Sequence, residues 1–144
     1  MRVNIFLSCL VYLALAIGAS AQGINDLTGT WRTVRHGALV TITDCGNGSP
    51  CGGLEQVSTA ITNGHTTDIR NPNATLRTRP LIGVPILWGF ASGTEGWRNG
   101  HLYNPDDGKT FRAYLRLLSP NELRVTGCLG PFCRSQIWTR ISNP

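Results

Sequence analysis

The residue types that most often perform chemistry are few in this chain and lack a catalytic spacing. The three histidines, His36, His65 and His101, have no metal-ligand spacing between them, so surface or turn roles are expected. Asp106 and Asp107, in "NPDDGKT", are paired carboxylates of the kind used in acid–base catalysis or calcium binding, but neighbours on a tight turn should point apart. No serine-hydrolase elbow, zinc-protease motif or phosphate loop occurs. The sequence therefore predicts no catalytic residue, no metal site and no cofactor.

A second set of polar side chains is better suited to binding a ligand. Arg77 and Arg79 are two residues apart, and on an extended segment they would face the same way and could hold a carboxylate or a phosphate. The expected ligand is a small amphipathic anion with its tail inside the protein and its head at the rim. The predicted ligand-binding residues are Asp68, Asn71, Arg77, Arg79, Tyr103 and Asp106. The alternative is that Arg79 pairs with Asp68 or Asp106 and only pins a loop, since arginine is equally suited to structural ion pairs.

The first 21 residues have the pattern of an export signal. Arg2 gives a positive start, residues 5–17 form an apolar run, and residues 19–21 read Ala-Ser-Ala, the pattern that signal peptidases cut. The run is short for a membrane span, which needs about 20 residues. No second apolar segment follows. We therefore expect a signal peptide over residues 1–21, cleavage near Ala21, and one soluble domain over residues 22–144 in the periplasm or outside the cell.

The charge of the predicted mature chain argues against a nucleic-acid partner. It keeps 12 basic and 8 acidic residues, and 11 of the 12 basic residues are arginine. These arginines are scattered along the chain, whereas a nucleic-acid groove concentrates charge on one face. A mildly basic, solvated surface is expected.

The four cysteines left after cleavage form two close pairs. In an exported chain this predicts disulfides, although four cysteines permit three connectivities. Cys45 with Cys51 and Cys128 with Cys133 are favoured, because each pair brackets a turn rich in glycine or proline. A four-cysteine zinc site is the alternative, and both the first spacing and an oxidising compartment disfavour it.

The elements that must position these residues are strands. Helix signals are nearly absent, with 17 glycines and 8 prolines in the chain, and residues 110–118 alternate apolar and polar side chains as a half-buried strand does. The remaining polar segment, residues 58–79, is a long loop or hides a short element. The predicted strands span residues 30–36, 38–45, 51–57, 80–90, 96–103, 109–118, 122–128 and 134–141.

Eight strands joined mostly by hairpins predict an all-β, antiparallel up-and-down barrel. Such a barrel is either just filled by side chains or has room for one small ligand. With an even number of strands, Trp31 on the first and Arg140 on the last meet at one rim, where the guanidinium can cover the indole and Gly29 lets the backbone approach. The loop at 58–79 then lies at the other rim with Tyr103, unless it hides one more strand.

Several motifs together resemble a known family. They are "GTWRT", "CGNGSPCGGL", "DIRNPNATLRTRPLIGVPIL", "GWRNGHLYNPDDGKTFRA" and "LRVTGCLGPFCRSQIWTR", and they cover nearly the whole predicted mature chain. The series is similar to the exported bacterial family called domain of unknown function 2147, and the Gly-x-Trp with a late arginine resembles the lipocalin and wider calycin barrels. The resemblance implies a lipocalin-like fold and an exported location, and leaves the activity open.

Three classes of function fit these observations. The first is non-catalytic binding of a small amphipathic or anionic ligand at the open rim of the barrel. The second is inhibition of a periplasmic protease or lysozyme by a segment inserted into its cleft. The third is a structural module that interacts with an envelope protein and has no cavity.

Overall fold

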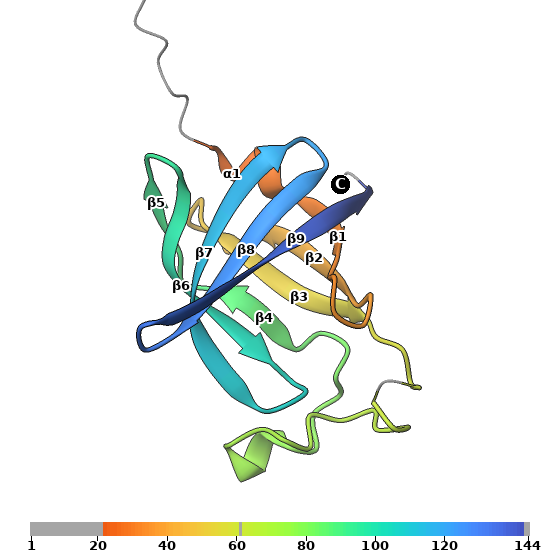
Figure 1. Ribbon diagram of the computed structural model, residues 1–144. Helices are drawn as coiled ribbons and strands as arrows, with labels where there is room; N and C mark the ends of the chain where they lie inside the picture. The colour runs from red at the N-terminus through yellow and green to blue at the C-terminus, as the bar shows by residue number, and fades with distance from the viewer. Residues whose placement is uncertain (1–21, 61, 143–144) are drawn as a thin grey trace, which may run out of the picture.

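The computed structural model describes residues 22–60 and 62–142, which form one short helix and a closed, all-β barrel (Figure 1). The predicted signal peptide lies outside the described residues. The helix α1 spans Ile24–Leu27 and a single 3-10 turn, η1, spans Ala74–Leu76. The strands are β1 (Gly29–Arg32), β2 (Leu39–Asp44), β3 (Pro50–Gln56), β4 (Pro85–Trp88), β5 (Ala91–Gly93), β6 (Gly96–Asn104), β7 (Lys109–Ser119), β8 (Glu122–Leu129) and β9 (Phe132–Ser142).

The barrel is the predicted eight-stranded antiparallel meander, with one strand interrupted. The sheet order is β4-β3-β2-β1-β9-β8-β7-β6-β5, and β4 also pairs with β6, which closes the barrel. The strand predicted at residues 80–90 is shorter in the structure, where it corresponds to β4. The extended conformation is then interrupted at Gly89, before β5 begins. Gly89 has a φ of 75°, a conformation that favours glycine. The next residue, Phe90, packs its ring onto Gly100, where an added Cβ would lie 2.3 Å from a ring carbon.

The first strand also ends earlier than predicted. It stops at Arg32 rather than residue 36, because His36 and Gly37 have φ angles of 75° and 60° and form the turn into β2. The long segment over residues 58–79 adds no strand among its described residues; it contains η1 and one isolated bridge between Thr67 and Pro80. The even strand parity therefore holds, and this segment lies at the opposite end of the barrel from α1 (Figure 1).

Side chains from every wall fill the barrel interior. On β7, Ala113 and Leu115 are fully buried, as the alternating pattern predicted, and the indoles of Trp31, Trp97 and Trp138 are buried in the same cluster. Leu81 and Val84, from the end of the long segment, belong to this cluster too. Burying this apolar surface supplies the main driving force for folding, at about 25 cal/mol per Å².

The two cysteine pairs are those predicted. Cys45 and Cys51 lie 5.2 Å apart at Cα, and Cys128 and Cys133 lie 4.0 Å apart, each pair at disulfide distance.

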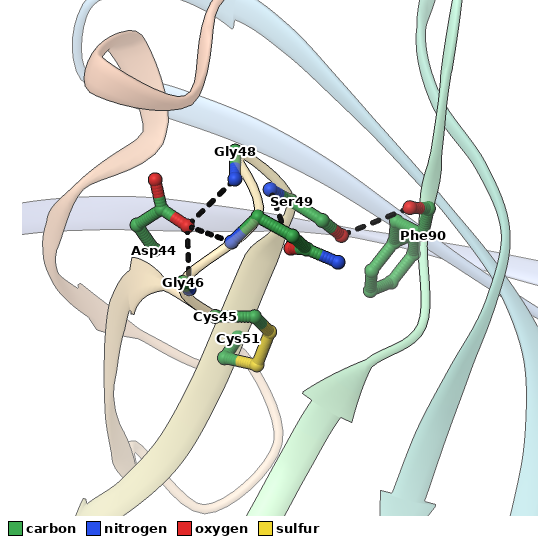
Figure 2. Close-up of a disulfide and its surroundings, with 8 residues drawn as sticks. Asp44, Cys45, Gly46, Gly48, Ser49, Cys51 and Phe90 are labelled. Atoms are coloured by element: carbon green, nitrogen blue, oxygen red, sulfur yellow. Dashed lines mark hydrogen bonds between the residues drawn. A yellow bond between two sulfur atoms is a disulfide. The ribbon is translucent and has the colours of Figure 1, made fainter.

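The first cysteine loop is held by side-chain hydrogen bonds despite its glycines. One carboxylate oxygen of Asp44 accepts hydrogen bonds from the backbone N–H groups of Gly46, Asn47 and Gly48, at 2.7 to 3.1 Å. The Ser49 hydroxyl donates to the carbonyl of Phe90 at 2.9 Å, which ties the loop to the β4–β5 break (Figure 2). These bonds replace the helical or sheet partners that a glycine-rich turn lacks.

Arg140 closes the end of the barrel near α1. Its guanidinium carbon lies 4.1 Å from the centroid of the Trp31 ring. Its three nitrogens donate at 2.5 to 2.6 Å to the backbone carbonyls of Pro120, Thr28 and Asp26. Burial lowers the pKa of this guanidinium from its usual value, and the nearby Asp26 carboxylate partly offsets the effect. One side chain thus joins α1, the start of β1, the β7–β8 turn and the last strand.

The Trp31 indole is also held by a hydrogen bond from its ring nitrogen. Its N–H donates to the carbonyl of Leu27 at 2.8 Å, within α1. Gly29, between them, has a φ of 127°, so a side chain at this position would strain the backbone that leads into β1.

Replacing Arg140 with Ala should lower the free energy of unfolding by about 2 to 4 kcal/mol, because three charge-assisted hydrogen bonds and a cation–π contact are lost together. Trp31→Ala should cost roughly 3 to 5 kcal/mol, since it leaves a cavity. Urea denaturation of both single variants and the double variant measures the coupling. Arg140→Lys is the matched control, which keeps the charge but cannot reach three carbonyls. A double variant whose loss equals the sum of the singles would show that the two residues do not interact.

Candidate ligand-binding site

A buried carboxylate organises the end of the barrel opposite Arg140. Asp68 is fully buried, and its two oxygens accept four hydrogen bonds. The Tyr103 hydroxyl donates to Oδ1 at 2.6 Å. The Asn71 amide donates to Oδ2 at 2.8 Å, and Arg79 donates to the same oxygen through Nη2 at 2.7 Å and Nε at 3.0 Å. We call Asp68, Asn71, Arg79 and Tyr103 the Asp68 knot.

The knot forms because the long segment crosses the outer face of β6. Tyr103 pairs with Thr110 in the strand register, next to the inward-facing pair Leu102 and Phe111, so its side chain points out of the barrel and is covered by the segment. The segment is fixed again at the β6–β7 turn, where Arg70 donates to the carbonyl of Asp106 at 2.6 Å.

The environment of Tyr103 keeps its hydroxyl protonated. Burial, and next the hydrogen bond to Asp68, raise the pKa of Tyr103 to about 12. The neutral phenol therefore acts as a donor to the carboxylate throughout the physiological pH range. Arg79 also lies over the Tyr103 ring, with its guanidinium carbon 5.8 Å from the centroid.

Of the predicted ligand-binding residues, the structure brings four together and separates two. Arg77 does not lie on an extended segment, as the sequence had suggested, but follows η1 in a helical conformation. Its Nε donates to the backbone carbonyl of Asn71 at 2.8 Å, whereas Arg79 donates to the Asp68 carboxylate. Asp106 lies at the surface, where its carboxylate is 3.0 Å from the Nε2 of His36.

A groove of about 610 Å³ lies beside the Asp68 knot. We call it the wall groove, because its lining residues come from the strands of the barrel wall and from the long segment. Gly52 and Gly53 locate it: an added Cβ on Gly52 would meet core side chains at 3.0 to 3.1 Å, whereas one on Gly53 would meet nothing within 4 Å. Successive side chains of a strand point to opposite faces, so Gly53, which lines the groove, faces outward. The predicted site was instead at the rim, with the ligand's tail in the barrel interior.

The wall groove is mainly apolar and has one polar end. Its residues are Thr43, Cys51, Gly52, Gly53, Asn71, Pro72, Leu76, Arg79, Gly83, Pro85, Leu87, Trp88, Tyr103 and Thr110. The Asp68 knot contributes three of them, with Arg79 about one third exposed (29%). Among the described residues, Arg79 Nη1 has no hydrogen-bond acceptor, because only Nε and Nη2 bind Asp68.

Sequence reasoning missed the apolar part of this groove. Trp88 is half-buried at the end of β4 and stacks on His101 of β6, with ring centroids 5.3 Å apart. Alternation in the sequence does not reveal which way Trp88 faces, because a bulge at Ile86 in β4 shifts the register of this strand with β3. The alternation in β4 is therefore broken just where it would have identified the outward side chain.

In the described part of the chain, no helix is long and apolar enough to cross a membrane. No group of three or more histidine, cysteine or acidic side chains there is placed to hold a metal ion.

Comparison with known proteins identifies relatives of the fold. The family described as "Uncharacterized protein conserved in bacteria (DUF2147)" matches residues 29–140. A solved structure described as "Protein HP1028 from the human pathogen Helicobacter pylori belongs to the lipocalin family" is similar, with a TM-score of 0.68 and 25% sequence identity. The match covers 81% of this chain and 84% of the other. No curated protein matches the chain.

Proposed function

Because the chain belongs to the DUF2147 family and folds as a lipocalin-like barrel, we propose that it is an exported, non-catalytic protein that binds a small amphipathic anion in the wall groove. The observation that carries the proposal is the combination of a mainly apolar groove with the free Nη1 of Arg79 at one end. Apolar clefts of about 300 to 1,000 Å³ with a few placed polar groups are typical of small-molecule sites. Export is supported by the sequence of residues 1–21 and by the two disulfides.

We expect each part of such a ligand to occupy a different part of the groove. An alkyl tail would lie along the outer face of the wall, against Trp88, Leu76 and Pro85, over the gap left by Gly53. A carboxylate head would accept from Arg79 Nη1. The Asp68 carboxylate already fixes the guanidinium in place, so little side-chain entropy is lost when the head group binds.

The pairing of Arg79 with Asp68 limits how much electrostatic attraction can contribute to the affinity for an anionic ligand. The net charge of this ion pair is close to zero. The head group would therefore be held mostly by a directed hydrogen bond and only weakly by long-range electrostatic attraction. We therefore expect the apolar contacts to set most of the affinity, and a carboxylate to be preferred over an alcohol of the same chain length by a modest factor.

Filling the groove tests this function. Gly53→Leu places a side chain where an added Cβ meets no neighbour, so the protein should fold normally while decanoate binds at least about tenfold more weakly, a loss of about 1.4 kcal/mol. Isothermal titration of decanoate and decanol measures both the groove and the head-group preference. Thr139→Leu, at an exposed position on β9, is the matched control and should bind as the wild type does. Equal affinity of the Gly53 variant and the wild type would remove the groove as the site.

One observation favours inhibition of an envelope enzyme as a second candidate. The β8–β9 hairpin projects from the barrel (Figure 1), and its tip carries Phe132, 80% exposed, directly opposite Leu129, 52% exposed. The Cys128–Cys133 pair cross-links the hairpin one residue pair before the tip. A rigid apolar tip loses little conformational entropy when it enters a partner's cleft.

Inhibition assays test this second candidate. The purified protein is titrated against a lysozyme and a panel of serine proteases, and inhibition should weaken by about 30-fold or more in Phe132→Ala if the ring is a hot spot worth about 2 kcal/mol. Val34→Ala is the control, since Val34 is also exposed but lies on the β1–β2 turn. Absence of inhibition across the panel, or equal inhibition by the Phe132 variant, would rule out this role for the hairpin.

A further inference from the structure

A second hollow, of about 370 Å³, lies on a different part of the barrel wall and gathers arginines that are distant in the sequence. Arg98 comes from β6, Arg116 from β7 and Arg124 from β8. We call this the cationic hollow. Its arginines face outward: Arg116 and Arg124 are direct partners across β7 and β8, and each follows or precedes a residue whose side chain is buried in the core.

The arginines of the cationic hollow are poorly compensated. Like charges directly opposite each other on neighbouring strands destabilise a sheet, and Arg116 and Arg124 are placed in that way. The nearest acid is Glu95, whose carboxylate lies 3.6 Å from Arg116, but both side chains are largely exposed, so the pair contributes little. Among the described residues, no carboxylate lies within ion-pair distance of Arg98 or Arg124. Glu95 is therefore the one acidic residue of the described chain that lines a hollow with three arginines.

The lining adds aromatic and hydrogen-bonding groups. Tyr114 and Thr126 are half-buried in the hollow. A fourth arginine, Arg112, covers the Tyr114 ring, with its guanidinium carbon 5.7 Å from the centroid. Trp97 also lines the hollow, and its indole N–H is buried with no acceptor in the described part of the chain. Its ring is buried in the core, as is the side chain of its strand partner Leu115, so the Trp97 signal reports on the wall directly beneath the hollow.

We propose that the cationic hollow binds the phosphate monoester of a molecule about the size of a sugar. Guanidinium groups match the geometry of phosphate oxygens with paired hydrogen bonds, and three of them suit a dianion better than a carboxylate. The volume is that of a small-molecule site. The rest of the ligand would lie against Tyr114, whose ring carries Arg112 on one face, and Thr126, whose hydroxyl pairs with that of Ser135 at 2.7 Å. This goes beyond the proposed function, since the site lies on another wall and takes a different ligand.

Two sources could supply this chemistry: a soluble sugar phosphate or the phosphorylated head group of a lipid. Glucose 6-phosphate represents the first, and vesicles of phosphatidylcholine with phosphatidic acid represent the second, with phosphatidylcholine alone as the blank. Binding to glucose 6-phosphate without the vesicles assigns a soluble ligand. Vesicle binding that requires phosphatidic acid assigns a lipid head group.

Binding is measured by thermal unfolding and by the indole resonances of ¹⁵N-labelled protein at constant ionic strength. We expect glucose 6-phosphate to raise the Tm and to shift the Trp97 indole signal, while the Trp31 indole, which is bonded to Leu27, stays in place. Glucose should change neither the Tm nor the indole signal. Inorganic phosphate should bind more weakly than glucose 6-phosphate, because it lacks the sugar. A failure of both the sugar phosphate and the phosphatidic acid vesicles to bind would overturn the proposal.

Arg124→Gln separates a specific site from general attraction of anions. Without ligand, this variant should have a higher Tm than the wild type, because the repulsion from Arg116 is relieved, and its response to the phosphate ligand should fall at least tenfold. Arg134→Gln, an exposed arginine outside the hollow, is the control and should respond as the wild type does. A lower Tm for ligand-free Arg124→Gln, or equal responses in both variants, would contradict the assignment.

Discussion

The fully buried carboxylate of Asp68 is the constraint on which the functional end of this molecule depends. An ionised carboxylate is expensive to bury unless its oxygens accept enough hydrogen bonds, and here a phenol, an amide and a guanidinium supply four. Those donors come from the barrel wall and from the long segment. Satisfying the charge therefore fixes the segment against β6, and without that attachment the wall groove would lose one of its sides.

Each end of the barrel is held by one charged side chain, and the two charges have opposite signs. At one end a single cation, Arg140, donates hydrogen bonds to three backbone carbonyls and lies over the Trp31 indole. At the other end a single anion, Asp68, collects side-chain donors. Both charges draw together segments that are far apart in the sequence, and between them apolar side chains fill the interior. Leu81 and Val84, from the end of the long segment, add to the core cluster, and the groove that could hold a ligand lies beside the Asp68 knot.

The fold was largely predictable from the sequence, because its signals are local. Alternation over residues 110–118 and turn residues between strands predict the meander, and the even strand number predicts that Trp31 and Arg140 meet. The site was only partly predictable. The pairing of Arg79 with Asp68 was foreseen as one of two alternatives, but Arg77 was assigned an extended backbone that η1 replaces. The wall groove depends on a bulge in β4 and on the path of the long segment, and neither has a periodic signal. The gathering of Arg98, Arg116 and Arg124 likewise follows from strand register, so arginines that are scattered in sequence are neighbours in space.

The central claim is that ligand binds outside the barrel wall and not in its interior. Intermolecular nuclear Overhauser effects from ¹³C-labelled decanoate to the protein test it most directly, since they report which side chains touch the tail. The account predicts contacts to Trp88 and Leu76, which line the wall groove. Contacts from the tail to Trp138 or Leu115, which are buried in the core, would contradict it.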